Sequence, residues 1–367
     1  MSEAVPSVRP TRRRRALASA SVLTAGVCVA GVVAASPADA HPQQLHVTKV
    51  LSSSFVGPLQ FAVSGRTFVV ADAFTSTLAT LNGTPLAHGP SPATGGDVGG
   101  VAINRARGEI AYTTSNGDHS RTTLTVLRHG KKVQVVNLAA FERKYNPDHI
   151  RTYGVAHPSS CVRKALTAAN VPVHYRGAID SHPYAVASLG RGVWAVADAG
   201  GNDILRVDAR GRISVLSVLP AQRFTITKAF AAQNHLSNCV VGVKYYVEGV
   251  PTDVEASGSK LYVSTLPGAD APHRGRVYSI DRRTHHRVFL GSGLNMATNL
   301  AVTPGGRIFV AELGSGRISQ LVHGRPVAVA SVPGVVGLEY TNGHLYASTA
   351  PAVTGGGGPG QIVQLGS

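Results

Sequence analysis

The chain has 367 residues, of which 43% are hydrophobic and 15% charged, and it contains 41 glycines and 21 prolines. This apolar content is enough for a folded core, which excludes an intrinsically disordered protein. The low fraction of charged residues excludes coiled coils and helical bundles, which need faces rich in Glu, Lys and Leu. The formal net charge is +16, but the chain beyond residue 40 has no long basic run, so we expect no nucleic-acid partner.

The first segment, residues 1–40, has the pattern of a secretory signal peptide. Arg12 to Arg15 form a positive head, Ala16 to Ala35 is an uncharged run, and Ala38-Asp39-Ala40 is a small-x-small cleavage site. We therefore expect cleavage near Ala40, a secreted, extracellular mature chain of residues 41–367, and no membrane span after cleavage. The alternative is a single membrane anchor, because the apolar run is just long enough to cross a bilayer.

The mature chain repeats one pattern six times. Each copy has a short apolar strand, a turn, usually with glycine, a second strand that ends in a small or acidic residue, and one or two further strands. The second strands are Thr67–Asp72, Glu109–Thr114, Gly192–Asp198, Lys260–Thr265, Arg307–Glu312 and His344–Thr349. Short strands rich in Val, Ile, Leu and Tyr and bounded by Gly, Asn and Asp are typical of antiparallel hairpins.

Six such units predict an all-β fold, a six-bladed β-propeller, because a closed ring buries the faces that one unit leaves exposed. The inner strands start at Gln60, Gly100, Ala185, Asp253, Asn299 and Gly337. The sixth unit has three strands, and the lone strand Leu45–Leu51 is expected to close the ring as the outer strand of the last blade. A β-sandwich or an up-and-down barrel is the alternative, but neither explains the regular inner-strand starts.

Two of the connections between units are long, and we expect them to be inserts on one face of the ring, at about residues 142–182 and 220–249. Cys161 lies in the first insert and Cys239 in the second. In an oxidising compartment a pair of cysteines is most simply a disulfide, so we expect these two to be bonded. A buried pair of free thiols is the alternative.

Four motifs resemble one known family. They are Asn146-Pro147-Asp148, Asp180-Ser181-His182-Pro183-Tyr184-Ala185-Val186, the run from Val196 to Asp208, and Val250-Pro251-Thr252-Asp253-Val254. Together they resemble the ScyD/ScyE family of secreted propellers with NHL-like repeats. The chain departs from that pattern in its long insert between Asp148 and Asp180. The resemblance implies an extracellular propeller and assigns no catalytic residue.

Two sets of polar residues are candidates for a ligand site at the mouth of the channel. Gln60, Asp253 and Asn299 open inner strands, and these oxygen donors could hold a divalent cation, although one carboxylate makes a weak metal site. Asp72, Asp198 and Glu312 end second strands, near the face that carries the inserts. These three would either present hydrogen-bonding groups to a ligand or cap the neighbouring turns.

No nucleophile motif, phosphate loop or zinc spacing is present, so we expect a binding or scaffold protein without catalytic residues or a cofactor. Its partner would be a small molecule, a glycan or a protein, bound on the face with the inserts. The alternatives are a metal-dependent hydrolase or lactonase of the gluconolactonase-like propeller type, acting near Asp253 and Asn299, and a purely structural envelope protein.

Overall fold

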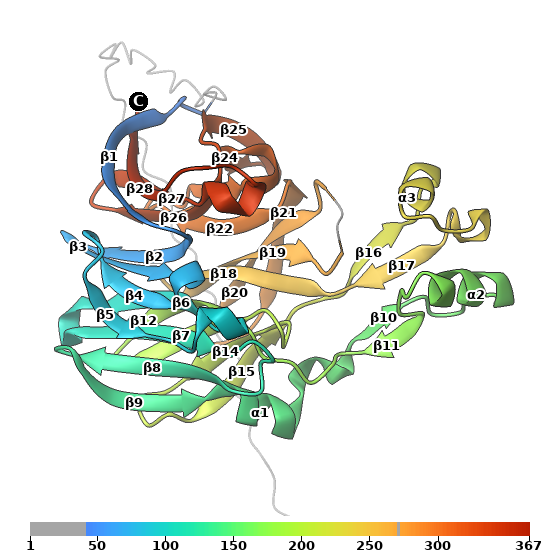
Figure 1. The fold of residues 1–367 in the computed structure, drawn as a ribbon, viewed down its shortest axis with the longest axis horizontal. Coiled ribbons are helices and arrows are strands. Elements are labelled where there is room, and N and C mark those ends of the chain that lie inside the picture. Colours follow the sequence, from blue (N-terminus) through green and yellow to red (C-terminus); the bar gives the residue numbers. More distant parts are fainter. Residues whose placement is uncertain (1–41, 270–271) are drawn as a thin grey trace, which may run out of the picture. The chain divides into compact units, whose positions relative to one another are not determined.

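A computed structural model describes residues 42–269 and 272–367 of the chain. The predicted signal peptide and its cleavage site lie outside the described residues. Among the described residues, 28 strands form seven four-stranded antiparallel sheets, so the prediction of an all-β protein is confirmed (Figure 1). No helix in the described ranges is long and apolar enough to span a membrane.

Five of the sheets are each built from four consecutive strands that pair in chain order. They are β2 (Pro58–Ser64), β3 (Thr67–Asp72), β4 (Thr77–Thr80) and β5 (Pro85–His88); β6 (Asp97–Asn104), β7 (Glu109–Ser115), β8 (Thr122–Arg128) and β9 (Lys131–Asn137); β12 (Pro183–Gly190), β13 (Val193–Asp198), β14 (Asp203–Val207) and β15 (Ile213–Val218); β18 (Gly249–Ser257), β19 (Lys260–Pro267), β20 (Gly275–Asp281) and β21 (Arg287–Leu294); and β22 (Ala297–Val302), β23 (Ile308–Glu312), β24 (Arg317–Val322) and β25 (Arg325–Ser331).

The sixth sheet combines the two ends of the described chain. Its strands β26 (Val335–Thr341), β27 (His344–Thr349) and β28 (Gly360–Gly366) come last, and β1 (His46–Phe55) pairs antiparallel with β28. The register runs from His46 opposite Gly366 to Phe55 opposite Gly360, with three bulges. Figure 1 shows the blue strand β1 beside the red strands of this sheet.

The first strands of these six sheets contact one another in a cyclic order. β2 contacts β6 and β26, β12 contacts β6 and β18, and β22 contacts β18 and β26. Apolar side chains fill the space between neighbouring sheets, as where Trp194 of β13 and Val126 of β8 belong to one buried cluster. This packing explains why inner strands such as β3 and β13 are short apolar runs, because neighbouring sheets cover both of their faces, whereas outer strands such as β5 and β9 are largely exposed.

The two long connections fold together into the seventh sheet. Its order is β11 (His174–Arg176), β10 (Thr152–Gly154), β17 (Lys244–Val247) and β16 (Gln222–Thr225), so β10 of the first insert pairs with β17 of the second. The inserts also hold the helices α1 (Leu138–Tyr145), α2 (Ser160–Ala168) and α3 (Lys228–Gln233). Figure 1 shows this sheet, with α2 and α3, extending away from the other six.

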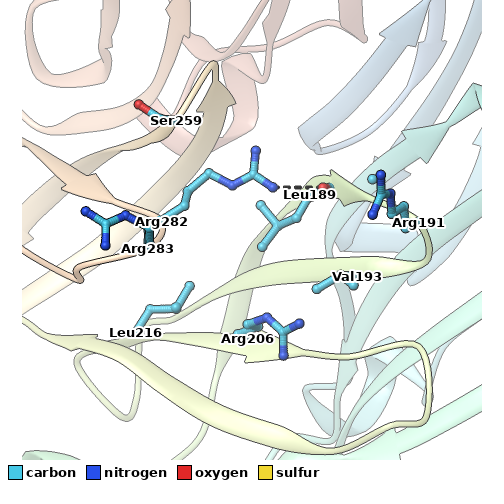
Figure 2. Close-up of a pocket in the computed structure, with 9 residues that line it drawn as sticks. Leu189, Arg191, Val193, Arg206, Leu216, Ser259, Arg282 and Arg283 are labelled. Carbon is cyan, nitrogen blue, oxygen red and sulfur yellow. Dashed lines mark hydrogen bonds between the residues drawn. The ribbon is translucent and has the colours of Figure 1, made fainter.

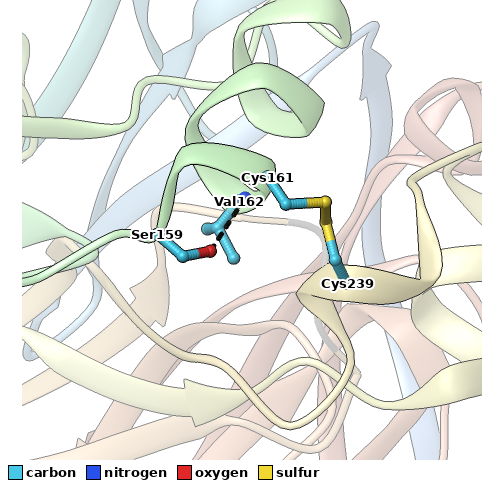
Figure 3. Close-up of a disulfide and its surroundings, with 4 residues drawn as sticks. All are labelled: Ser159, Cys161, Val162 and Cys239. Carbon is cyan, nitrogen blue, oxygen red and sulfur yellow. Dashed lines mark hydrogen bonds between the residues drawn. A yellow bond between two sulfur atoms is a disulfide. The ribbon is translucent and has the colours of Figure 1, made fainter.

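The predicted bond between Cys161 and Cys239 is confirmed (Figure 3). Cys161 lies in the first turn of α2, where the Ser159 hydroxyl accepts a hydrogen bond of 3.2 Å from the backbone amide of Val162 and so caps the helix. Cys239 lies in a short 3₁₀ turn of the second insert.

The seven 3₁₀ turns of the described ranges are Ala73–Thr75, Pro92–Thr94, Arg105–Arg107, Pro147–Ile150, Asn238–Val240, Leu313–Ser315 and Pro351–Thr354.

Candidate functional site

Three of the predicted site residues have the same role in three different sheets. Asp72, Asp198 and Glu312 end the second strand of their sheets and are buried. Each carboxylate accepts a backbone N–H from the loop that leads into the first strand of the same sheet. These bonds are Gly57 N to Asp72 Oδ1 at 2.7 Å, His182 N to Asp198 Oδ1 at 2.7 Å, and Asn295 N to Glu312 Oε2 at 2.6 Å. This role in fastening a loop requires no ligand, and binding of a ligand by these residues stays a prediction.

The other three predicted residues belong to a buried network that joins first strands of different sheets. Asn299 of β22 donates through Nδ2 to Gln60 Oε1 of β2 at 2.8 Å, and its Oδ1 accepts the Leu338 amide of β26 at 2.8 Å. Asp253 Oδ2 of β18 accepts the Leu300 amide at 2.9 Å. The amide oxygens of Gln60 and Asn299 are therefore already bonded. Within the described residues, no group of three or more His, Cys, Asp or Glu side chains is placed to hold a metal ion.

A narrow pocket of about 150 Å³ lies further along the same first strands, and sequence analysis did not predict it. It is lined by β2, β6, β12, β18 and β26, and its acidic side chains are Glu255 and Glu339. Burial raises the pKa of both carboxyls well above the ordinary range, and for Glu255 the charges of Glu339 and Asp253 raise it further. The alternation of side chains along a strand could have indicated Glu255 as a site residue, because Glu255 is two residues after Asp253 and therefore lies on the same face of the strand.

A mostly apolar cavity in the insert sheet measures about 400 Å³. It lies between the two inserts and the end of β19. The side chains that line it are mostly aliphatic and aromatic: Leu166, Val171, Tyr175, Phe224, Ile226, Phe230, Leu236, Tyr245 and Val247. The aromatic rings pack on one another, with the Phe224 centroid 5.4 Å from that of Phe230 and 5.7 Å from that of Tyr245. Phe224 and Tyr245 are buried, so one wall of the cavity is set by the packing of β16 on β17.

The polar side chains that line this cavity are Asn170, Tyr175, Asn234, Tyr245 and Glu248, and the two tyrosine hydroxyls are held in place by hydrogen bonds. The Tyr175 hydroxyl donates to Glu248 Oε1 at 2.5 Å, and the Tyr245 hydroxyl donates to the Pro172 carbonyl at 2.6 Å. Burial, together with the bond to Glu248, raises the pKa of Tyr175 far above its ordinary value, so this hydroxyl remains a donor. The Arg274 guanidinium lies 5.6 Å from the Phe224 ring centroid. The arrangement can enclose an apolar molecule and offer it one carboxylate.

A second cavity, of about 380 Å³, lies between the sheets of β12–β15 and β18–β21 and is lined by Arg191, Arg206, Arg282 and Arg283 (Figure 2). Arg282 donates to the carbonyls of Leu189 at 2.8 Å and Gly258 at 3.1 Å, so its guanidinium joins the two sheets. Figure 2 shows Arg191 and Arg283 at opposite ends of this cavity. The guanidinium groups therefore do not converge on one anion.

Comparison with solved structures identifies the fold. The chain superposes on a PQQ-bound aldose sugar dehydrogenase from Streptomyces coelicolor with a TM-score of 0.53 and 12% identity, over 88% of this chain and 97% of that one. For a glucose dehydrogenase the TM-score is 0.51 at 11% identity, over 87% and 99% of the two chains. The chain is a β-propeller.

A third propeller, the gluconolactonase XC5397 from Xanthomonas campestris, matches with a TM-score of 0.50 and 12% identity, over 86% of this chain and 87% of that one. At such identities the likeness shows the fold alone. No protein family model and no curated protein sequence matches the chain. Membership of the ScyD/ScyE family therefore stays a prediction.

Proposed function

We propose that this propeller is an extracellular binding protein that takes a small, largely apolar molecule in the cavity of its insert sheet. The observation that carries the proposal is the cavity itself, because both inserts are needed to build it and the disulfide joins them. Ligand sites are typically concave, lined mostly by apolar and aromatic side chains, and furnished with a few fixed polar groups. The cavity meets each of these criteria.

The scaffold in this proposal has six blades. The support is that six sheets share one strand order, that their first strands contact one another cyclically, and that β1 completes the sheet of β26, β27 and β28. The seventh sheet is then the recognition module, carried by the connections before β12 and β18.

Secretion rests on two observations. A disulfide persists in oxidising compartments, and the residues before Pro42 carry the pattern of a cleavable signal peptide. A secreted propeller would meet its ligand outside the cell, where the insert sheet is kept folded by the bond between Cys161 and Cys239.

The chemistry of the cavity limits the ligand class. Aromatic and aliphatic walls favour a ring-bearing or branched apolar molecule, and the Glu248 carboxylate favours one that carries a hydrogen-bond donor or a cationic group. The hydrolase alternative near Asp253 and Asn299 receives no such support, because the side-chain oxygens of Gln60 and Asn299 are bonded within the protein.

The test uses the neutral fluorescent probe N-phenyl-1-naphthylamine, which carries one N–H donor, and matched variants at Ala168, the last residue of α2, and at Ala169, which follows it. Ala169 lines the cavity, whereas its neighbour Ala168 is exposed and does not. We expect saturable binding by the mature protein, weakened at least about tenfold by Ala169→Trp, which fills the cavity, and unchanged by Ala168→Trp. Equal binding by both variants, or binding that never saturates, would show that the cavity is not a ligand site.

A further inference from the structure

Four buried carboxylates lie close together where the first insert joins the sheet of β12–β15. Glu142 lies in α1, Asp148 in the following 3₁₀ turn, Asp198 at the end of β13 and Asp203 at the start of β14. Their exposed fractions are 3%, 0%, 1% and 1%. No salt bridge among the described residues reaches any of them. Buried carboxylates without a cationic partner are costly, so this cluster needs a balancing charge or bound protons.

Several oxygens of the cluster have no hydrogen-bond donor. Both carboxylate oxygens of Asp203 are buried and unpartnered, as are Glu142 Oε1 and the side-chain oxygen of Asn202. Asn202 is itself 5% exposed, and its Nδ2 donates to Asp148 Oδ2 at 2.8 Å, which places its amide within the cluster. Asp198 differs from these residues, because Ser181, His182 and Gly201 donate to its oxygens. Unsatisfied acceptors of this number are rare in folded proteins unless an ion or water meets them.

Asp203 Oδ1, which has no hydrogen-bond partner, and Glu142 Oε2 border the space next to Gly201. A Cβ atom at this glycine would lie 3.4 Å from Glu142 Oε2, 3.6 Å from Asp203 Oδ1 and 3.6 Å from Asp198 Cγ. Oxygens from an insert helix and from a propeller hairpin therefore approach one point where the chain carries no side chain. All of these potential metal-ligand atoms are oxygens, with no thiolate or imidazole among them. Hard cations prefer such oxygen ligands.

We propose that Glu142 and Asp203, with the side-chain oxygen of Asn202, bind one calcium ion beside Gly201. Calcium accepts mixed sets of carboxylate, amide and water oxygens in flexible geometry, so two carboxylates suffice. This composition agrees with the lack of any three acidic, His or Cys side chains placed around one point in the described ranges. The ion would link α1 of the first insert to the β13–β14 turn. The proposal does not depend on the function proposed for the insert cavity.

The first experiment measures cation binding by the mature protein after treatment with a chelator. Terbium is the probe, because Tyr153, whose hydroxyl is 3.4 Å from Asp148 Oδ2, lies close enough to excite its luminescence. We expect roughly one saturable equivalent of terbium, displaced by calcium, and a melting temperature that calcium raises at neutral pH. Asp203→Asn keeps the shape of the side chain and removes its charge. It should weaken binding at least about tenfold and abolish the thermal shift.

Two further variants keep the result interpretable if Asp203→Asn fails to fold. Gly201→Ala adds one methyl group at an ordinary contact distance, so it should fold, yet it occupies the space of the ion and should also lose terbium. Asp208→Asn is the matched control, because Asp208 follows the other end of β14 and pairs with Arg212. It should bind terbium and calcium as the unaltered protein does.

Three results would overturn the proposal. The first is no saturable terbium or calcium binding at millimolar cation, which would leave the carboxyls sharing protons. The second is binding that persists in both Asp203→Asn and Gly201→Ala. The third is a thermal shift with magnesium and none with calcium, since magnesium requires a smaller octahedral site.

Discussion

At the scale of single residues, the buried acidic side chains of this propeller are of two kinds: some accept hydrogen bonds from backbone amides, and others line a pocket. Asp72 and Glu312 each accept backbone amides, so their charges are solvated by the protein. Glu255 and Glu339 instead line a pocket of about 150 Å³, where burial raises the pKa of both carboxyls well above the ordinary range. The second kind of residue makes stability depend on pH.

The first prediction concerns this pH dependence. Burial raises the pKa of Asp253 to about 7 from an ordinary 3.8, and the pKa values of Glu255 and Glu339 lie well above 4.5. A raised folded-state pKa means that stability is complete below the unfolded pKa and falls as pH rises through the folded one. We therefore expect the free energy of unfolding, measured in denaturant, to fall from about pH 4.5 to beyond pH 7.

The variant Glu339→Gln tests the cause. At pH 8 it should be more stable than the unaltered protein by about 1 kcal/mol or more, because each pKa unit is worth about 1.4 kcal/mol. At pH 4 the two proteins should be equally stable, since the carboxyl is then protonated in both the folded and the unfolded state. An equal gain at both pH values would point to packing rather than to charge.

The sequence pattern identified some of the buried polar residues on the first strands and missed others, for a physical reason. Asp253 and Asn299 were found because the sequence pattern predicted that they open inner strands. These predicted starts were wrong by a few residues, since β18 begins at Gly249 and β22 at Ala297, but the structure does bring Asn299 to Gln60 of another sheet. Glu255 and Glu339 were missed because an acidic residue within an apolar strand is normally interpreted as pointing to solvent from the exposed face of that strand. Only the contacts among five different strands turn that face into the wall of a pocket.

At the scale of elements, the insert sheet is a small module with a core of its own. Val162 and Leu166 of α2 pack with Ala231 of α3 and Val247 of β17 in one buried cluster. Its strands are short, with three residues in β10 and four in β17, and only the pairing of these two strands joins one insert to the other within the described sheet. Such strands carry almost no local signal. The strands of the blades, in contrast, could be predicted from the sequence. For example, the strand predicted at Thr67–Asp72 is β3, with the same bounds.

The second prediction concerns the disulfide of this module. Cys161 and Cys239 are 78 residues apart, and closing a loop of that size stabilises the folded state by roughly 4 kcal/mol in the chain-entropy model. We expect Cys161→Ser to lower the free energy of unfolding by a similar amount and to weaken binding of the fluorescent probe in the insert cavity. Chemical denaturation with and without a reducing agent measures this change.

A reductant supplies the control for that experiment. The reduced, unaltered protein should match Cys161→Ser, and the variant itself should not respond to the reductant. If reduction left both the unfolding midpoint and probe binding unchanged, the bond would have no part in holding the inserts together.

At the scale of the whole molecule, stability depends on how the sheet at the chain ends is completed. Leu45 N donates to the Val329 carbonyl of β25 at 2.7 Å, and β1 then pairs along β28. Phe55, at the end of β1, is 3% exposed and packs with Phe61 of β2 and Ile362 of β28. The start of the described chain thus contacts three different sheets. In the proposed six-bladed ring, β1 adds a strand to the last blade and leads directly into β2 of the first, and so ties these two blades together in addition to the contact of β2 with β26.

The third prediction follows from that closure. A chain that begins at residue 56 lacks β1, leaves the edge of β28 unpaired and loses the buried Phe55 ring. Removing a buried phenylalanine alone costs about 3 kcal/mol or more, so the shortened protein should unfold at a clearly lower denaturant concentration than residues 42–367. A synthetic peptide of residues 42–55 should raise its melting temperature in a concentration-dependent way, because it binds only the folded ring. A peptide of the same composition in scrambled order should have no effect, since it cannot match the register on β28. Equal stability of the short and long chains would mean that the ring holds without its outer strand.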